Sequence, residues 1–361
     1  MHIRADRDDL AEAFIRANRA VGAKTALPIL QGVLCRATGN KLRVTGSDTE
    51  ITVRTAVEVE VIEEGGFVVP GRLMTDAIRR MPEGAITISS DNGEVELSGN
   101  GPRFTIRPLA LDDYPDLAEP DLGGAIQVDG KALVAAVTQV VVAASSDSAR
   151  PILTGVLIEN GDRGLRLVAT DSYRLAVRDL VDARVNGSAL VPARGLRELS
   201  RTVTSTVVSV AVQDREVVFA SERGSLSIRL IEGSFPNYRQ LLPQKYPNEV
   251  VLPKDRLLEA VARASLVAED HIPIRFKLAE GGVHLAVSRR DVGGESELVQ
   301  GDYRGEAAEV DIAFNSRYLS DGVSALEGDQ VRVEVVDGFK PSVIRAEGHD
   351  DFLYLLMPVR V

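Results

Sequence analysis

Apolar residues recur at the spacing of an amphipathic helix in three stretches of the chain. These stretches are residues 8–21, 129–144 and 253–268. Their matching leucines, Leu10, Leu133 and Leu257, lie 123 and 124 residues apart. Since a fixed long period is the signature of repeated structural units, the pattern predicts three equivalent helices, one in each of three repeats.

Two further landmarks keep this period. A second series of helices begins at three short motifs, Pro70-Gly71-Arg72, Pro192-Ala193-Arg194 and Asn315-Ser316-Arg317. The arginines of these motifs are 122 and 123 residues apart. The segments that follow the first helices contain Pro28, Pro151 and Pro273, which are 123 and 122 residues apart. Three independent landmarks at one spacing indicate three related domains.

Alternating apolar and polar residues between the helices predict short strands. The clearest are residues 32–37, 41–45 and 52–59 of the first repeat, and the Val-rich segments 66–69, 188–191 and 310–314 before the second helices. Pro-containing exits at 113–116 and 234–237 lead into predicted linkers at 117–124 and 242–248. We therefore place the domain boundaries at residues 1–120, 124–245 and 248–361.

Few helices among many strands favour an α+β fold, in which each of the three repeated domains packs two helices on antiparallel sheet. Aromatic residues make up only 4% of the 361 residues and Trp is absent, so Val, Leu, Ile and Ala must fill the cores. The single cysteine, Cys35, excludes an internal disulfide framework and fits a reducing cytoplasm. No signal peptide or spanning segment is evident, so we expect a soluble cytoplasmic protein with no membrane partner.

Charge is unevenly distributed along the chain. The net charge is −11, which argues against a protein whose whole surface attracts nucleic acid. The predicted helices nevertheless carry fourteen basic and ten acidic residues, a net of +4, so the remainder carries −15. These six helical windows are residues 7–22, 70–82, 129–145, 192–203, 253–269 and 315–326. Solvated helix faces are one explanation. Arg72, Arg194 and Arg317, however, all sit near helix N-termini, where the helix dipole gives a cation no benefit, and a polyanion passing these helices would supply another reason.

The sequence shows no recognisable catalytic or metal-binding motif of the kind that an enzyme would need. The four histidines show no metal-ligand spacing, and no phosphate-binding loop or G-x-S-x-G motif is present. Asp48 and Asp171 recur 123 residues apart after equivalent strands, which indicates turn formers rather than a catalytic pair. We therefore expect no catalytic residue, no metal and no cofactor. An interaction scaffold of repeated domains that does not bind DNA is an alternative.

Three segments of the chain resemble a known family. They are Ala169-Thr170-Asp171-Ser172-Tyr173-Arg174-Leu175-Ala176-Val177, the exit Phe235-Pro236-Asn237-Tyr238-Arg239, and the C-terminus Tyr354-Leu355-Leu356-Met357-Pro358-Val359-Arg360-Val361. Together with the threefold repeat, they are similar to the bacterial sliding clamps, the beta subunits of DNA polymerase III. The resemblance runs the full length of the chain. It differs from the commonest pattern at Tyr173 and Gln240.

The resemblance implies a non-catalytic processivity factor whose chain forms half of a closed ring. Two copies would close head to tail around double-stranded DNA and slide on it without reading its sequence. By position, the DNA-facing residues would be Lys24, Arg72, Arg150, Arg194, Arg197 and Arg317. Ring closure would bring Phe104 and Ile106, on an edge strand of the first domain, against Leu266 and Val267 at the end of a third-domain helix.

The resemblance also implies a pocket between the second and third domains. It would bind short peptides of the replicative polymerase, the clamp loader and repair proteins. By position its residues would be Leu153, Thr170, Ser172, Tyr173, Arg174, Leu175, Pro236, Leu241, Ser342, Val343, Leu355, Leu356, Met357, Pro358, Val359 and Arg360. Leu and Met walls suit varied ligands, and Thr170 and Arg174 are expected to orient the peptide.

Overall fold

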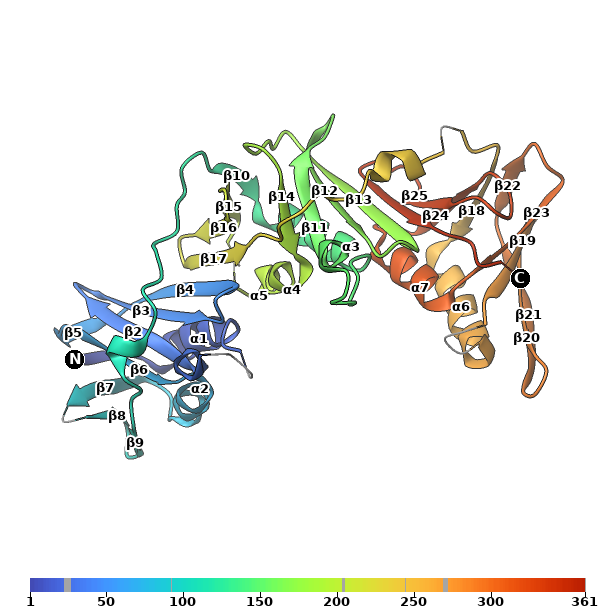
Figure 1. Ribbon diagram of the computed structural model, residues 1–361. Coiled ribbons are helices and arrows are strands. Elements are labelled where there is room, and N and C mark those ends of the chain that lie inside the picture. Colours follow the sequence, from blue (N-terminus) through green and yellow to red (C-terminus); the bar gives the residue numbers. More distant parts are fainter. Residues whose placement is uncertain (23–26, 92, 203–204, 244, 269–271, 361) are drawn as a thin grey trace. The chain divides into compact units, whose positions relative to one another are not determined.

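The computed structural model describes residues 1–22, 27–91, 93–202, 205–243, 245–268 and 272–360 (Figure 1). By its internal contacts the chain divides into two compact units. Unit 1 comprises Met1–Val134, Val185–Gly187 and Arg194–Leu230, and unit 2 comprises Ala135–Arg184, Ser188–Ala193 and Ile231–Val361. Each unit therefore holds one terminal repeat together with part of the middle repeat.

The helices are α1 (Arg7–Asn18), α2 (Gly71–Arg80), α3 (Gly130–Val141), α4 (Ala193–Leu196), α5 (Leu199–Thr202), α6 (Lys254–Ala268) and α7 (Ser316–Ala325). The strands of unit 1 are β1 (His2–Asp6), β2 (Gly32–Thr38), β3 (Lys41–Ser47), β4 (Ile51–Glu58), β5 (Glu60–Glu63), β6 (Gly65–Pro70), β7 (Ala85–Asp91), β8 (Glu94–Ser98), β9 (Arg103–Ile106), β10 (Ile126–Asp129), β15 (Val207–Val212), β16 (Glu216–Ser221) and β17 (Gly224–Arg229). The strands of unit 2 are β11 (Gly155–Asn160), β12 (Gly164–Thr170), β13 (Arg174–Val181), β14 (Ala189–Pro192), β18 (Asn248–Pro253), β19 (Ile274–Ala279), β20 (Gly282–Arg289), β21 (Gly293–Gln300), β22 (Asp302–Gly305), β23 (Glu309–Phe314), β24 (Gln330–Val335), β25 (Ser342–Ala346) and β26 (Phe352–Leu356).

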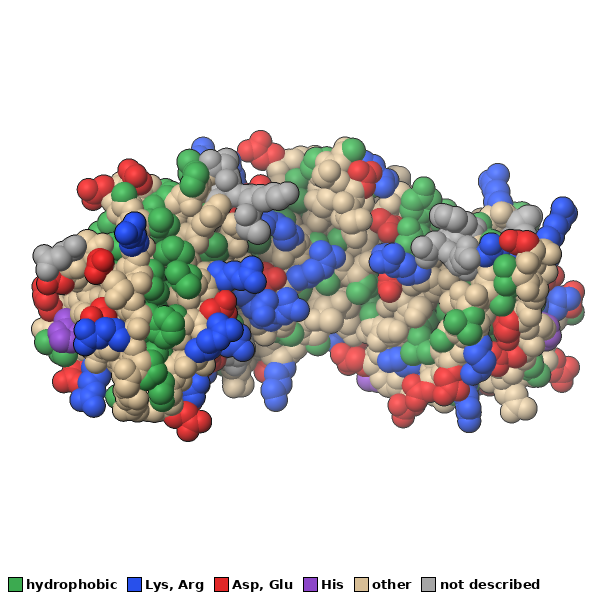
Figure 2. All heavy atoms as spheres, turned by 90° about the horizontal axis from the view of Figure 1, so that it is seen from below, with side chains coloured by type: hydrophobic (Ala, Val, Ile, Leu, Met, Phe, Trp, Pro, Cys, Tyr) green, Lys and Arg blue, Asp and Glu red, His purple; other side chains and the backbone are tan. Residues whose placement is uncertain are grey.

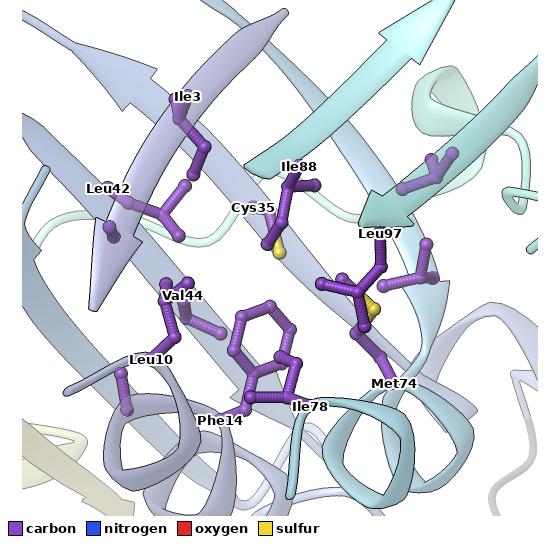
Figure 3. Packing of buried hydrophobic residues seen from close by; sticks show 14 of the residues in the cluster. Ile3, Leu10, Phe14, Cys35, Leu42, Val44, Met74, Ile78, Ile88 and Leu97 are labelled. Atoms are coloured by element: carbon purple, nitrogen blue, oxygen red, sulfur yellow. The ribbon is translucent and has the colours of Figure 1, made fainter. Parts of the chain in front are cut away.

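Unit 1 contains two antiparallel sheets, with strand orders β5-β1-β7-β8-β9 and β10-β15-β16-β17-β4-β3-β2-β6. The larger sheet joins the first repeat to the middle repeat, because β4 pairs with β17. Helices α1 and α2 cover the core of the first repeat, where Leu10, Phe14, Met74 and Ile78 are fully buried. Figure 3 shows these side chains directed toward those of the sheets, including the buried Cys35.

Unit 2 repeats this plan. Its sheets have the orders β14-β11-β12-β13-β26-β25-β24-β18-β22 and β21-β20-β19-β23. The larger sheet joins the middle repeat to the third repeat through the pairing of β13 with β26. The predicted antiparallel α+β fold is confirmed.

A backbone hydrogen bond occurs once in each repeat and supports the threefold relationship. The N–H of Leu109 donates to the carbonyl of Val68, that of Ile231 to Leu190, and that of Val359 to Ala313, each at 2.8 Å. Leu109, Ile231 and Val359 thus occupy equivalent positions. The three predicted first helices are found as α1, α3 and α6, slightly shorter than predicted.

The second helix of the middle repeat differs from the prediction of one helix over 192–203. It is split into α4 and α5 by a turn at Arg197 and Glu198. A Cβ on Gly195 would lie 2.7 Å from the side chain of Ile228, so glycine lets this backbone pack directly on β17. Because glycine is a poor helix former, Gly195 also weakens the helix and favours the break between α4 and α5. In the described part of the chain, no helix is long and apolar enough to cross a membrane.

Candidate functional site

Arginines gather on the helical face of unit 1. Two adjoining hollows there share Ile15, Arg19 and Arg79 in their walls. We call the two hollows together the basic groove, and its other arginines are Arg7, Arg16, Arg72 and Arg201. Figure 2 shows Lys and Arg side chains clustered over the part of unit 1 that carries these helices. Such a groove suits a polyanion bound through its phosphates.

Carboxylates lie among these cations. The ion pairs are Arg7 with Asp8 (2.9 Å) and Glu83 (3.8 Å), Arg16 with Glu12, Arg19 with Glu198 (3.4 Å) and Arg201 with Glu198 (3.6 Å). Arg72 and Arg79 are exposed and make no ion pair with any described residue. As far as the described residues go, the groove therefore combines cations on α2 that have no ion pair with paired cations elsewhere.

Of the five predicted DNA-facing residues that the structure describes, only Arg72 lines the basic groove. Lys24 lies outside the described residues. Arg197 and Arg317 are exposed at the ends of α4 and α7. Arg79 and Arg201 belong to the basic bias of the second helices that the sequence shows, although they are not among the six predicted contacts. Arg19 was missed, and the basic bias of the helical windows was the signal that could have found it.

Arg194 is held within the chain. Its Nη1 lies 2.6 Å from Asp48 Oδ2 and its Nη2 2.7 Å from Glu50 Oε2. Burial alone would lower the pKa of Arg194, but the hydrogen bond and charge of Asp48, followed by those of Glu50, raise it above its ordinary value. These carboxylates explain a cation at a helix N-terminus. Arg150 is likewise paired, with its Nε 2.9 Å from Asp147 Oδ2.

The turn between β12 and β13 forms one side of the predicted peptide site. Asp171 Oδ1 accepts hydrogen bonds from the N–H groups of Tyr173 (2.9 Å) and Arg174 (3.0 Å). Ser172 has a positive φ of 81°. In the first repeat, Asp48 closes the equivalent turn in the same way, accepting from Glu50 and Ile51. The prediction that Asp48 and Asp171 form turns is confirmed.

Arg174 is the centre of a buried polar network in unit 2. Its Nε lies 2.9 Å from Asp171 Oδ2 and its Nη1 2.6 Å from Asp321 Oδ2 on α7. The guanidinium also stands 4.4 Å from the ring centroid of Tyr318, a cation–π contact. Burial alone would lower the pKa of Arg174, but Tyr354, Asp321 and Asp171 together raise it. Arg174 therefore stays charged and ties the β12–β13 turn to α7.

Thr170 is also satisfied internally, because its hydroxyl donates to the carbonyl of Arg174 at 2.7 Å. Thr170 and Arg174 are only 4% and 8% exposed. Their polar groups shape the turn, so we expect them to position the site rather than to contact a peptide, in contrast to the orienting role expected from the sequence. Sequence reasoning missed Tyr318, Asp321 and Tyr354, because nothing in the local pattern marks them as partners of Arg174.

An apolar cluster forms the floor beside this turn. Its buried members are Val168, Leu175, Val177, Tyr238, Val343 and Leu355, with Phe235 and Met357 packed against them. Tyr173, Leu241 and Val359 stand exposed at 57%, 43% and 37%. The backbone joins these parts, since the N–H of Met357 donates to the carbonyl of Tyr173 at 2.9 Å. Exposed apolar side chains over an apolar floor suit an apolar ligand.

The remaining predicted peptide residues differ in exposure. Ser342 and Leu356 are fully buried and lie opposite each other in the β25–β26 ladder, so they support the floor. Leu153 is also buried. The exposed or half-buried positions are Ser172, Pro236, Pro358 and Arg360.

The predicted dimer residues occupy two edges. β9 is the edge strand of its sheet, as expected, but Phe104 and Ile106 point inward and pack on the core of the first repeat. Leu266 on α6 is 82% exposed, the most exposed large apolar side chain of the described chain, and Val267 is half-buried. Single exposed apolar side chains are common on protein surfaces, so the place of Leu266 in a dimer interface stays a prediction.

Comparisons with known proteins agree with this architecture. Family models described as the N-terminal, central and C-terminal domains of the DNA polymerase III beta subunit match residues 1–118, 127–237 and 239–360. The beta sliding clamp of Streptomyces coelicolor is 32% identical over 378 residues, covering 100% of both chains. Among solved structures, the DNA polymerase sliding clamp from Bacillus subtilis aligns with a TM-score of 0.94 at 26% identity, covering 100% of this chain and 99% of that chain. A sliding clamp from Pseudomonas aeruginosa bound to griselimycin gives the same TM-score and identity over 100% of both chains. The chain therefore belongs to the family of bacterial beta sliding clamps, the beta subunits of DNA polymerase III.

Proposed function

We propose that two copies of this chain close head to tail into a ring around duplex DNA, slide along it and tether replication proteins. The ring would contain six domains, bounded in each chain at residues 1–120, 124–245 and 248–361. It would act in the bacterial cytoplasm as a non-catalytic subunit of the polymerase. The observation that carries this proposal is the pairing of strands at the two junctions between repeats.

Both internal junctions use the same strands in the same register. In unit 1, Val53 of β4 lies opposite Leu226 of β17. In unit 2, Ala176 of β13 lies opposite Tyr354 of β26. Val53 and Ala176 are 123 residues apart, so they occupy equivalent positions. Leu226 lies five residues before Ile231, and Tyr354 lies five residues before Val359, which is the equivalent of Ile231. The junction is therefore a repeated structural feature.

Each of the two junction strands has a counterpart at a sheet edge, with no strand paired on its outer side in the part of the chain that the structure describes. β9 of the first repeat corresponds to β17 and β26, because Phe104 precedes Leu109 by five residues. β21 corresponds to β4 and β13, and both β9 and β21 are edges of their sheets. A second copy would allow β9 of one chain to pair with β21 of the other, since unpaired edge strands favour such addition.

The repeated register predicts which residues meet. In the middle repeat, Val181 pairs with Gly164, the first residue of β12, and Ala176 lies five residues before Val181. In the third repeat, Gln300 pairs with Gly282, the first residue of β20, and Glu295 lies five residues before Gln300. Glu295 therefore corresponds to Ala176. We expect Phe104 of one chain to lie opposite Glu295 of the other.

The two edges carry opposite charge, although Arg103 is paired with Glu96 (3.2 Å) and Glu297 with Arg263 (2.8 Å) within the chain. β9 is flanked by Arg103 and Arg107, whereas β21 carries Glu295 and Glu297. Glu295 Oε2 is buried without a hydrogen-bond partner among the described residues. Burial and then the charge of Glu297 raise the pKa of Glu295. Opposite charge at the two edges favours the approach of a second copy, although in this register Arg103 lies on the other face of the ladder from Glu295.

The basic groove would bind the sugar–phosphate backbone of the enclosed duplex. Arginine–phosphate contacts carry no sequence information, so the ring would bind any duplex and slide. Topology, rather than tight contacts, would keep it on DNA. Lys24, Arg150, Arg194, Arg197 and Arg317 remain proposed contacts beside those of the basic groove.

Retention on DNA tests encirclement. Rings loaded by a bacterial clamp loader onto nicked circular plasmid should stay bound through gel filtration in moderate salt. They should be lost once a single cut makes the plasmid linear, because a ring slides off a free end. Equal retention on linear and circular DNA would contradict encirclement and favour an open scaffold.

The turn of Tyr173, the apolar floor and the C-terminal segment would bind peptides of the polymerase, the clamp loader and repair proteins. The equivalent surface at the other junction is polar. Glu50 corresponds to Tyr173 and Thr52 to Leu175, and Thr52 faces Ser227 where Leu175 faces Leu355. An apolar peptide therefore has one favourable site in each chain.

We accordingly expect calorimetric titration with a synthetic peptide of the replicative polymerase to give one site per chain, or two per ring. Leu241→Asp should weaken binding about tenfold or more, since it places a charge beside an apolar ligand. The matched change Leu73→Asp, at an exposed leucine of α2, should leave the affinity unchanged. Two sites per chain would show that the first junction also binds peptide.

A further inference from the structure

Glu198 occupies an unusual place in the basic groove. It lies in the turn between α4 and α5 of the middle repeat. Its Oε2 is 3.4 Å from Nη1 of Arg19, the residue that ends α1 of the first repeat, and its Oε1 is 3.6 Å from Nη1 of Arg201 on α5. One carboxylate thus holds two cations that come from different repeats.

These ion pairs are loose and accessible. Arg19 and Arg201 keep 36% and 56% of their side chains exposed, and Glu198 keeps 20%. The structural pair of Arg166 and Asp179 is different, because its two hydrogen bonds of 2.6 and 2.7 Å are shorter and both side chains are largely buried. Exposed pairs at long distance contribute little to stability and exchange readily.

A carboxylate and a phosphate offer an arginine the same kind of partner, an anionic oxygen pair that accepts charge-assisted hydrogen bonds. A duplex in the groove would therefore compete with Glu198 for Arg19 and Arg201. The free energy gained when an arginine contacts a phosphate is reduced by the loss of its ion pair with Glu198. Each contact then forms and breaks with little net change in free energy.

We propose that Glu198 is an internal substitute for phosphate, which holds Arg19 and Arg201 when no phosphate is near and exchanges with DNA phosphates as the ring slides. This inference rests on the proposed function, because it requires a duplex at the basic groove. It gives Glu198 a positioning role: it keeps two cations of the groove ordered but weakly bound, so that they do not anchor the ring. Arg72 and Arg79, which have no such partner among the described residues, would attract the duplex.

The test is Glu198→Gln, which keeps the shape of the side chain and removes its charge. Binding to a fluorescein-labelled 20-base-pair duplex would be followed by anisotropy between 50 and 200 mM salt. We expect several-fold tighter binding at 50 mM salt. We also expect the slope of log affinity against log salt to steepen by up to about two, since two more cations release counterions on contact with phosphate.

Two controls separate this effect from general charge. Glu94→Gln removes an equal charge at an exposed position of strand β8 in the same unit, and it should leave the salt slope unchanged. In a chain that carries Arg19→Ala and Arg201→Ala, Glu198→Gln should have no further effect on affinity or slope. The shorter variant Glu198→Asp, which retains the charge but draws it back from both arginines, should give an intermediate slope even if the glutamine variant folds poorly.

The outcomes separate the inference from the proposed function. Equal slopes for wild type, Glu198→Gln and Glu198→Asp would overturn the role of Glu198 while leaving DNA binding intact. A gain that persists without Arg19 and Arg201 would overturn it as well. A wild-type chain whose affinity for duplex does not depend on salt would instead contradict DNA binding by the basic groove.

Discussion

Leu266→Asp should convert the proposed dimeric ring into monomers. Leu266 is 82% exposed in the single chain, so the substitution costs the fold little. In the proposed dimer it would bury an unpaired carboxylate, a loss of about 3 kcal/mol or more and hence more than a hundredfold in the dimerisation constant. Sedimentation velocity or light scattering at micromolar concentration would report the change in mass.

Phe339→Asp is the matched control for this experiment. Phe339 is 79% exposed, in the loop between β24 and β25, and has no place in the proposed interface. Its substitution introduces the same charge at a comparable apolar site and should leave the dimer intact. A Leu266→Asp chain that remains dimeric would show that α6 does not take part in ring closure. Phe104→Arg would test the other edge, although part of its effect would fall on the core against which Phe104 packs.

Arg174→Ala should destabilise unit 2 by about 3 kcal/mol, because removing one member of a buried ion-pair network leaves its partners uncompensated. Asp171, Asp321 and Tyr354 would each lose a partner. The β12–β13 turn would also lose its link to α7, so peptide affinity should fall even though Arg174 does not line the exposed surface. Urea denaturation followed by circular dichroism would measure the first effect, and peptide titration the second.

Arg150→Ala provides the comparison for Arg174. The ion pair of Arg150 with Asp147 is exposed, with 43% and 47% of the two side chains accessible. Its loss should cost less than about 1 kcal/mol. If Arg174→Ala were no more destabilising than Arg150→Ala, the network around Arg174 would not hold the turn to α7.

The peptide site and the DNA surface differed in how far the sequence could define them. Leu175, Val343 and Leu355 of the apolar floor were named through the resemblance to the sliding clamps, because an apolar strand by itself indicates burial and not a ligand surface. The basic groove was predictable only as a bias toward cations on the helices. Which arginine meets which carboxylate depends on helices brought together from different repeats, as for Arg19 and Glu198, which are 179 residues apart.

The sequence by itself determined the threefold period, the kind and order of the elements and the turns at Asp48 and Asp171, because these depend on spacings and hydrogen bonds within a few residues. Only the tertiary structure decided that Phe104 and Ile106 of the edge strand point inward, that Arg194 is held by Asp48 and Glu50, and that Arg174 reaches Asp321. The side chains of Arg194 and Asp48 are separated by 146 residues, and those of Arg174 and Asp321 by 147. Such pairs form only where strand pairing between successive repeats brings distant elements together, and no local pattern encodes that distance.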